Sequence, residues 1–113
     1  AVALGEIIRD SGDASVVVMP SDIFVADPWP LSAALGFAVR EVQRRRGLVL
    51  TIATHAEEDS ARYLLELADA DGVQPVRRVR SYRANPNRYS TRVAIVSTGI
   101  HVAAATALLA LLR

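Results

Sequence analysis

The sequence predicts a single α/β domain over residues 1–113, with a mixed, mostly parallel sheet and flanking helices. Two observations carry this prediction. Runs of β-branched residues alternate along the chain with segments whose apolar residues recur at helical spacing. The length of 113 residues suffices for one hydrophobic core and is too short for two.

The first expected elements are a helix and a strand. Residues 2–8 place apolar side chains at helical spacing, and the Asp-Ser-Gly of residues 10–12 ends that segment. Residues 15–19 form a mostly β-branched run, which is typical of a strand covered on both faces. Pro20 closes this strand.

A second helix and a second strand follow. Asp27 is a candidate N-cap, because the residues after it include the prolines that a first helical turn tolerates. Apolar residues then recur at helical spacing between Leu31 and Val42, and Glu41 and Arg45 form an i, i+4 pair on the opposite face. Residues 48–53 follow as a second buried strand. Strand, helix and strand in this order predict a right-handed crossover and a parallel pair.

The rest of the chain is predicted to form a hairpin, a strand and a closing helix. Residues 62–67 could be helical by propensity, but the turn after them and the long strand ending near Arg83 favour a hairpin. Residues 92–97 form another strand, which Ser97–Gly99 breaks. Residues 103–112 form the closing helix.

The composition excludes several kinds of site and partner. Cysteine is absent, which rules out disulfides, thiolate metal sites and a cysteine nucleophile. All 13 basic residues are arginines, so no side-chain amine can form a Schiff base or anchor a phosphate. The net charge of +1, and arginines of residues 77–83 that alternate between two strand faces, argue against a nucleic-acid partner. We expect no membrane segment, no signal peptide and a cytoplasmic location.

Asp22 is the first candidate functional residue. It lies just past the strand at residues 15–19, and ligands of open α/β sheets bind beyond the carboxyl ends of strands. A carboxylate there can hold Mg²⁺, which takes oxygen ligands and bridges to phosphates. The alternative is that Ser21 and Asp22 only shape a turn.

Other polar residues follow less specific patterns. His55 and His101 have no carboxylate at a catalytic spacing, which favours structural or solvent-facing roles over a metal site. The acidic run at residues 57–59 is typical of a solvated loop, and its functional alternative is a second metal ligand or an acceptor for sugar hydroxyls. The six glycines are scattered singly, so no glycine-rich phosphate loop is present.

The order of these segments resembles the sugar-nucleotide pyrophosphorylases, most of all mannose-1-phosphate guanylyltransferase. The segments are AVALGEII at the start, VVVMPSDIFVADP at residues 16–28, GLVLTIAT at residues 47–54 and STGIHV at residues 97–102. In that family a strand ends in Pro-Ser-Asp or Pro-Ala-Asp, an Asp-Pro begins the next helix, and an Asn-Ser-Gly-Ile-Phe segment comes later. The resemblance covers nearly the whole chain.

The resemblance implies a Rossmann-like nucleotidyltransferase core that is incomplete at the N-terminus. The implied reaction joins a sugar 1-phosphate to a nucleotide and releases pyrophosphate, with Mg²⁺ and cationic side chains stabilising the phosphate charge. It implies Mg²⁺ bound by Asp22 and a nucleotide-sugar or sugar-phosphate pocket. The site residues carried over by the resemblance are Ser21, Asp22, Tyr63, Ser97 and Gly99.

Several functional side chains of that family are missing from this sequence. The family's Gly-Tyr-Gly-Tyr aligns with residues 60–63, where only Tyr63 is kept, and its Glu-Lys-Pro aligns with Ala84, Asn85 and Pro86. The family's glycine-rich triphosphate loop lies upstream of the residues present. Loss of one charged phosphate ligand costs on the order of a hundredfold in rate. We therefore expect the chain alone to lack transferase activity.

Three hypotheses follow. The chain is a fragment or divergent enzyme that another segment or partner chain completes. Alternatively, it is a non-catalytic module that binds a nucleotide sugar or docks on an active pyrophosphorylase. In the third, it is a structural domain that associates with itself or with a partner through an exposed sheet edge.

Overall fold

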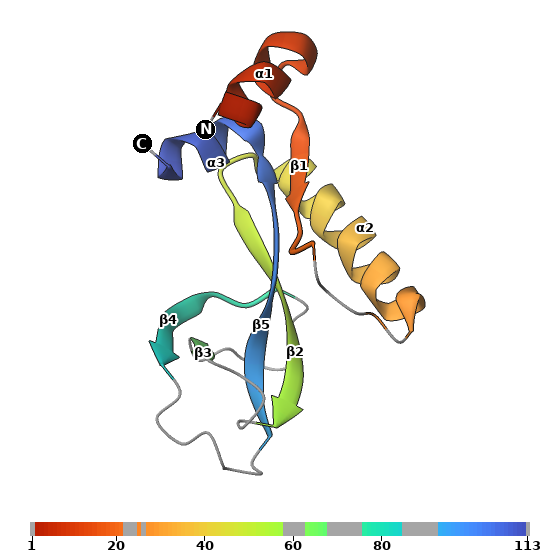
Figure 1. Cartoon of the computed structure of the whole chain (residues 1–113), viewed down its shortest axis with the longest axis vertical. Helices are drawn as coiled ribbons and strands as arrows, with labels where there is room; N and C mark the ends of the chain where they lie inside the picture. The colour runs from red at the N-terminus through yellow and green to blue at the C-terminus, as the bar shows by residue number, and fades with distance from the viewer. Residues whose placement is uncertain are drawn as a thin grey trace. The chain divides into compact units, whose positions relative to one another are not determined.

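The structure is a computed structural model of the chain, and it describes residues 2–21, 25, 27–57, 63–67, 76–84 and 93–112. The elements are, in order, α1 (Val2–Ser11), β1 (Ser15–Val18), α2 (Pro28–Arg44), β2 (Val49–Glu57), β3 (Tyr63–Leu67), β4 (Val79–Ala84), β5 (Val93–Ala104) and α3 (Ala105–Leu111) (Figure 1). The chain divides into two compact units. The first unit comprises Ala1–Ile52 and Gly99–Arg113, and the second comprises Ala53–Thr98. The predicted α/β class is confirmed.

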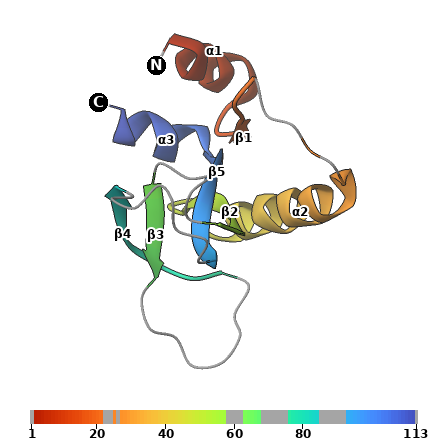
Figure 2. The ribbon, with the colours of Figure 1, turned by 60° about the horizontal axis from the view of Figure 1, so that its bottom comes forward.

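α1 ends at the glycine where the sequence predicts it to end. Gly12 has a φ of 67°, a left-handed conformation that glycine adopts without strain. Its backbone N–H donates to the carbonyl of Ile8 at 2.9 Å and closes the last turn of the helix. Leu4 is the buried residue of α1. The helix lies beside α3 (Figures 1 and 2).

α2 begins at the predicted N-cap. The Oδ1 atom of Asp27 accepts a hydrogen bond from the backbone N–H of Trp29 at 3.2 Å, and Pro28 occupies the first helical position. Proline fits there because its missing N–H would have no partner within the helix.

The apolar face of α2 builds the core of the first unit. Ala38 and Val42 are buried against Val102 and Ala104 of β5. The partly buried residues that complete this cluster are Leu35, Val39, Leu50, Ile52 and Ala107. The helical stripe predicted from the sequence is therefore the stripe that covers the sheet.

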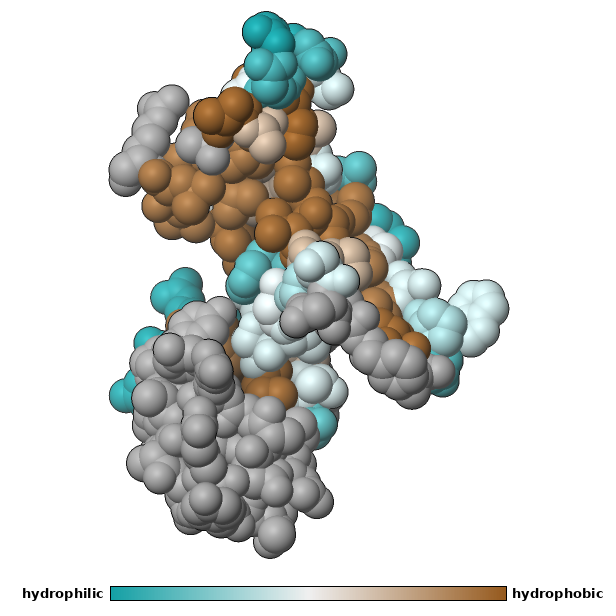
Figure 3. Space-filling model, viewed as in Figure 1, coloured by the Kyte–Doolittle hydropathy of each residue, from teal (hydrophilic) through white to brown (hydrophobic). Residues whose placement is uncertain are grey.

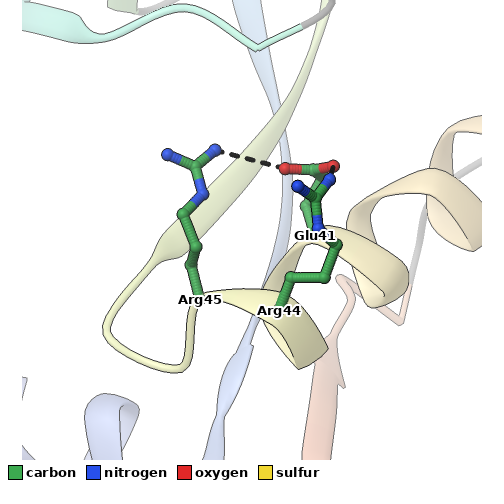
Figure 4. A network of polar contacts seen from close by, with 3 residues as sticks. All are labelled: Glu41, Arg44 and Arg45. Atoms are coloured by element: carbon green, nitrogen blue, oxygen red, sulfur yellow. Dashed lines mark hydrogen bonds and ion pairs between the residues drawn. The ribbon is translucent and has the colours of Figure 1, made fainter.

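The charged face of α2 carries the predicted pair of Glu41 and Arg45. Arg45 donates to one carboxylate oxygen of Glu41 at 3.2 Å, and Arg44 donates to the other at 3.0 Å (Figure 4). Both arginine side chains are well exposed, so each pair contributes about 0.3–0.5 kcal/mol at most.

The sheet of the first unit is antiparallel where the sequence predicts a parallel pair. β1 pairs with β5 in an antiparallel register that runs from Ser15 opposite Ala104 to Val18 opposite His101. β2 also pairs with β5, so β5 lies between the two strands that α2 connects (Figure 1). The prediction of a Rossmann-like, mostly parallel sheet is therefore wrong for the described strands. Its physical reason is the insertion of β5, which comes from the far end of the sequence.

β5 is longer, and α3 shorter, than predicted. The strand continues through Gly99 to Ala104, and the helix begins at Ala105. Gly99 keeps a φ of 81° within the strand, so the glycine that predicts a strand break is accommodated. Pairing with β1 overrides the helical propensity of the two alanines before α3. β2 likewise extends past its predicted end to Glu57.

The predicted hairpin forms in the second unit. β3 and β4 are antiparallel, from Tyr63 opposite Ala84 to Leu67 opposite Val79, with an irregularity near the end of β3. Leu64 of β3 lies opposite Val96 of β5. Leu65 and Val96 are the buried apolar residues of this unit's described part.

β1 is more exposed than predicted. The sequence predicts a strand covered on both faces, but Val17, Val18 and Met19 are 38%, 42% and 45% exposed. β1 stands at one end of the strand order β1-β5-β3-β4. Within the described ranges it therefore has a strand partner on one side only. As for the helices of these ranges, none has the length and apolar character needed to cross a membrane.

Candidate functional site at the carboxyl end of β1

The carboxyl end of β1 packs closely against Gly99 of β5. A Cβ atom at Gly99 would lie 3.0 Å from Cγ and 3.7 Å from Cδ of Pro20. The nearer distance is well below the 3.5–4.0 Å at which carbon atoms attract each other best. The φ of 81° disfavours any other residue independently. Gly99 is therefore required both by its backbone conformation and by the approach of Pro20.

Of the predicted site residues, Gly99 takes part in this contact and Ser21 adjoins it in the sequence. Ser21 follows Pro20 directly in the chain and is exposed, and Gly99 is the residue that Pro20 contacts. The register that sets Val18 opposite His101 leads to Pro20 opposite Gly99 two positions further on. Pro20 and Gly99 therefore lie side by side, although they are far apart in the sequence. Asp22, the predicted metal ligand, lies outside the described residues.

The other two predicted site residues belong to the second unit. Leu64 and Val96 are antiparallel partners, and the adjoining positions in that register are Tyr63 and Ser97. Ser97 is half-buried. The backbone of Tyr63 begins β3, and its side chain lies outside what the structure describes. The predicted residues thus fall into two pairs, one in each unit.

A polar network at the amino end of β1 is absent from the sequence predictions. Arg46 donates to Oγ of Ser15 at 3.0 Å and to the backbone carbonyl of Asp13, and its guanidinium lies 3.6 Å from the Asp13 carboxylate. The other carboxylate oxygen of Asp13 accepts a hydrogen bond from the backbone N–H of Thr106 at 2.9 Å. Asp13 therefore caps α3, whose own N-cap, Ala104, has no side chain that could do so.

This network lowers the pKa of the Asp13 carboxyl below its ordinary value. The main cause is the hydrogen bond from the backbone N–H of Thr106, which favours the charged form, and the positive charge of Arg46 acts in the same direction. Both oxygens of the carboxylate already face partners. The group therefore ties β1 to α3 and is not a free base or metal ligand.

Thr51 and His101 form a second polar pair in the first unit. Oγ1 of Thr51 lies 2.9 Å from Nδ1 of His101, and both residues are half-buried. Because Val102 faces α2, strand alternation places His101 on the sheet face away from that helix. A hydroxyl that satisfies one ring nitrogen agrees with the structural role expected for His101.

The described ranges contain no group of three or more His, Cys, Asp or Glu side chains that could hold a metal ion. Mg²⁺ commonly takes one or two carboxylates and completes its shell with water and substrate phosphates. Asp22 and the neighbouring hydroxyl of Ser21 are a donor set of that limited kind. They fit Mg²⁺ only together with a phosphate ligand, and the Mg²⁺ site stays a prediction.

The remaining polar candidates face solvent where they are described. His55 is exposed on β2, and Arg77, Arg78 and Arg80 are exposed in and before β4. The side chains of the acidic run at residues 57–59 lie outside the described part of the chain. Among the described residues, the carboxyl end of β1 is therefore where a close tertiary contact adjoins predicted ligand-binding residues.

No protein-family model, curated protein or solved structure matches this chain. The resemblance to sugar-nucleotide pyrophosphorylases therefore rests on the sequence segments themselves.

Proposed function

We propose that this chain is a nucleotidyltransferase-like domain that binds a nucleotide sugar or a sugar phosphate at the carboxyl end of β1 and does not complete the transfer alone. The observation that supports the proposal is the contact of Pro20 with Gly99. It joins the two segments that most resemble the pyrophosphorylase family. The antiparallel sheet departs from the core that the resemblance implies, so the proposal depends on this contact and not on the strand order.

The proposed binding residues have distinct roles. Ser21 is exposed and offers a hydroxyl to a phosphate oxygen. Asp22 would hold Mg²⁺, which when bound neutralises phosphate charge. Gly99 lets β5 approach Pro20 closely, directly before Ser21 in the chain. Tyr63 and Ser97 are proposed as further sugar or nucleotide contacts from the family resemblance alone.

The proposed lack of turnover follows from side chains that the sequence does not contain. Phosphoryl and nucleotidyl transfer depend on positioned cations that stabilise the transition state. The chain has no lysine, and Ala84 and Asn85 stand where the resemblance expects glutamate and lysine. Binding survives such a loss more readily than catalysis does, because catalysis needs interactions that strengthen in the transition state.

Calorimetric titration of the full chain with GDP-mannose, with and without Mg²⁺, tests the proposal. We expect binding that needs Mg²⁺ and disappears in Asp22→Ala. Asp10→Ala is the matched control, because Asp10 is an exposed aspartate on α1 that is remote in sequence from Asp22. It should bind as the parent does.

The outcomes separate the hypotheses. Magnesium-dependent heat that Asp22→Ala abolishes and Asp10→Ala preserves supports the binding site. Absence of heat at millimolar GDP-mannose, GTP and mannose 1-phosphate contradicts it. Turnover of GTP and mannose 1-phosphate by the purified chain would contradict the part of the proposal that denies catalysis.

A second candidate function is an interaction domain without a nucleotide ligand. The observation that favours it is the exposure of Val17, Val18 and Met19 on a strand that has a partner on one side only within the described ranges. The same titration distinguishes the two candidates, since an interaction domain binds none of these ligands.

A further inference from the structure

β1 exposes apolar side chains on both of its faces. Successive residues of a strand point to opposite faces, and Val17 and Val18 are 38% and 42% exposed, followed by Met19 at 45%. A sheet strand with a covered face would bury one of the two valines. Exposure on both faces leaves β1 without a covering layer, and among the described strands its outer edge has no partner.

The outer edge of β1 lacks the features that usually protect such edges. Natural edge strands carry charges, prolines or bulges that prevent pairing with other chains. Residues 14–19 contain no charged residue and no proline, and the register of β1 with β5 is regular over its whole length. β4, at the other end of the strand order, carries Arg80 and Arg83. Of the two strands at the ends of this order, β1 is therefore the one without a charged residue.

We propose that two copies of this chain associate through the outer edges of β1, paired antiparallel about a two-fold axis. The argument for a second copy is the composition of the strand. A two-fold axis near Val17 sets residues 15–19 of one copy against the same uncharged residues of the other. No register near this axis brings like charges face to face, and each brings valine or methionine against apolar partners. This inference does not depend on the proposed ligand.

The first unit exposes further apolar side chains away from β1. Leu111 and Leu112 at the end of α3 are 66% and 59% exposed in the same unit. Figure 3 shows apolar residues, in brown, gathered over this unit in that view. β1 has only four residues, so the paired interface is small. Interfaces below about 1,200 Å² are typical of weak or transient complexes, so we expect a dissociation constant on the order of micromolar.

Sedimentation velocity of the full chain over a concentration series tests this proposal. The parent should pass from monomer to dimer as its concentration rises. Val18→Lys and, as a second variant, Met19→Lys should each raise the dissociation constant by at least about tenfold, because each places charges in the paired edge. Circular dichroism establishes that each variant is folded.

Leu111→Lys is the matched control. It changes a more exposed apolar residue of the same unit to lysine without touching the strand edge. Dimerisation that both β1 variants weaken and Leu111→Lys preserves supports the proposal. A monomer at every concentration up to about a hundred times the expected constant overturns it, as does an oligomer that Leu111→Lys weakens as much as the β1 variants do.

Discussion

Replacement of Gly99 by alanine should destabilise the protein through two separate effects. Its φ of 81° lies in the region where a Cβ atom costs about 1–2 kcal/mol. The new Cβ would also lie 3.0 Å from Cγ of Pro20, so β1 and β5 would have to separate by a few tenths of an ångström. Together we expect a loss of about 1–3 kcal/mol. That is a large share of the 5–15 kcal/mol that stabilises a typical domain.

Two other glycines separate these effects. Gly12 also has a positive φ, of 67°, but an added Cβ would meet nothing within 4 Å. Gly12→Ala should therefore show the conformational cost alone, about 1 kcal/mol. Gly36 lies inside α2, where an added Cβ would meet only the end of Arg40 at 3.6 Å. Gly36→Ala should stabilise the helix by about 0.5–1 kcal/mol.

Urea unfolding of the four proteins measures these differences. The expected order of stability, from highest to lowest, is Gly36→Ala, parent, Gly12→Ala and Gly99→Ala. Melting temperatures should follow, with about 4–8 °C for each kcal/mol. A double-mutant cycle with Pro20→Ala should show that removal of the proline ring recovers part of the Gly99→Ala loss. If Gly99→Ala is no less stable than Gly12→Ala, the close approach of Pro20 to Gly99 is refuted.

Three further predictions concern the polar contacts. Asp27→Ala should lower the free energy of unfolding by about 1 kcal/mol in denaturant titrations, whereas Asp27→Ser should keep most of the cap; equal losses would contradict its role as N-cap. The folded-state pKa of Asp13 is below its ordinary value of 3.8, so its carboxylate stabilises the fold above that pH, and this contribution is lost as pH falls through the folded-state pKa. The melting temperature of the parent should therefore fall more steeply below about pH 4 than that of Asp13→Asn, and parallel curves would contradict the contact with Thr106. Thr51→Val should cost about 0.5–1.5 kcal/mol and shift the ring resonances of His101 in NMR spectra; unchanged resonances would show that the two side chains do not meet.

Local patterns in the sequence predict the elements whose cause is local. α2 follows from its helical stripe and from Asp27, and the β3–β4 hairpin follows from the turn-like residues between two strand-like runs. β5 could not be predicted in this way. The sequence predicts a strand break at Gly99 and a helix at Ala103 and Ala104. These two alanines are instead in a strand because they pair with Val16 and Ser15 of β1. Pairing of β1 with β5 also explains why the predicted parallel pair is wrong, since β5 comes from the far end of the chain.

The candidate site likewise combines features that a local sequence pattern predicts with contacts that arise only in the tertiary structure. The proline before Ser21 predicts that this serine lies past the end of a strand, which is a local signal. The contact of Pro20 with Gly99 has no local signal, because nothing in the spacing of residues 20 and 99 predicts that they meet. No sequence pattern predicts the hydrogen bonds of Asp13. They join Asp13 to Arg46 and Thr106 across 33 and 93 positions, and Arg46 is one of three consecutive arginines.

The proposed binding site and the proposed dimer interface use different residues, so they can be tested separately. The proposed binding depends on Ser21 and Asp22, whereas the proposed dimerisation depends on the backbone edge before Pro20. Val18→Lys therefore leaves the proposed ligand residues intact, and Asp22→Ala leaves the edge intact. A chain that dimerises through β1 but takes no nucleotide sugar is an interaction domain without a nucleotide ligand. A chain that binds GDP-mannose equally well as parent and as Val18→Lys carries its site within one copy. Loss of binding in folded Val18→Lys would instead mean that the second copy completes the site, which joins the two proposals into one.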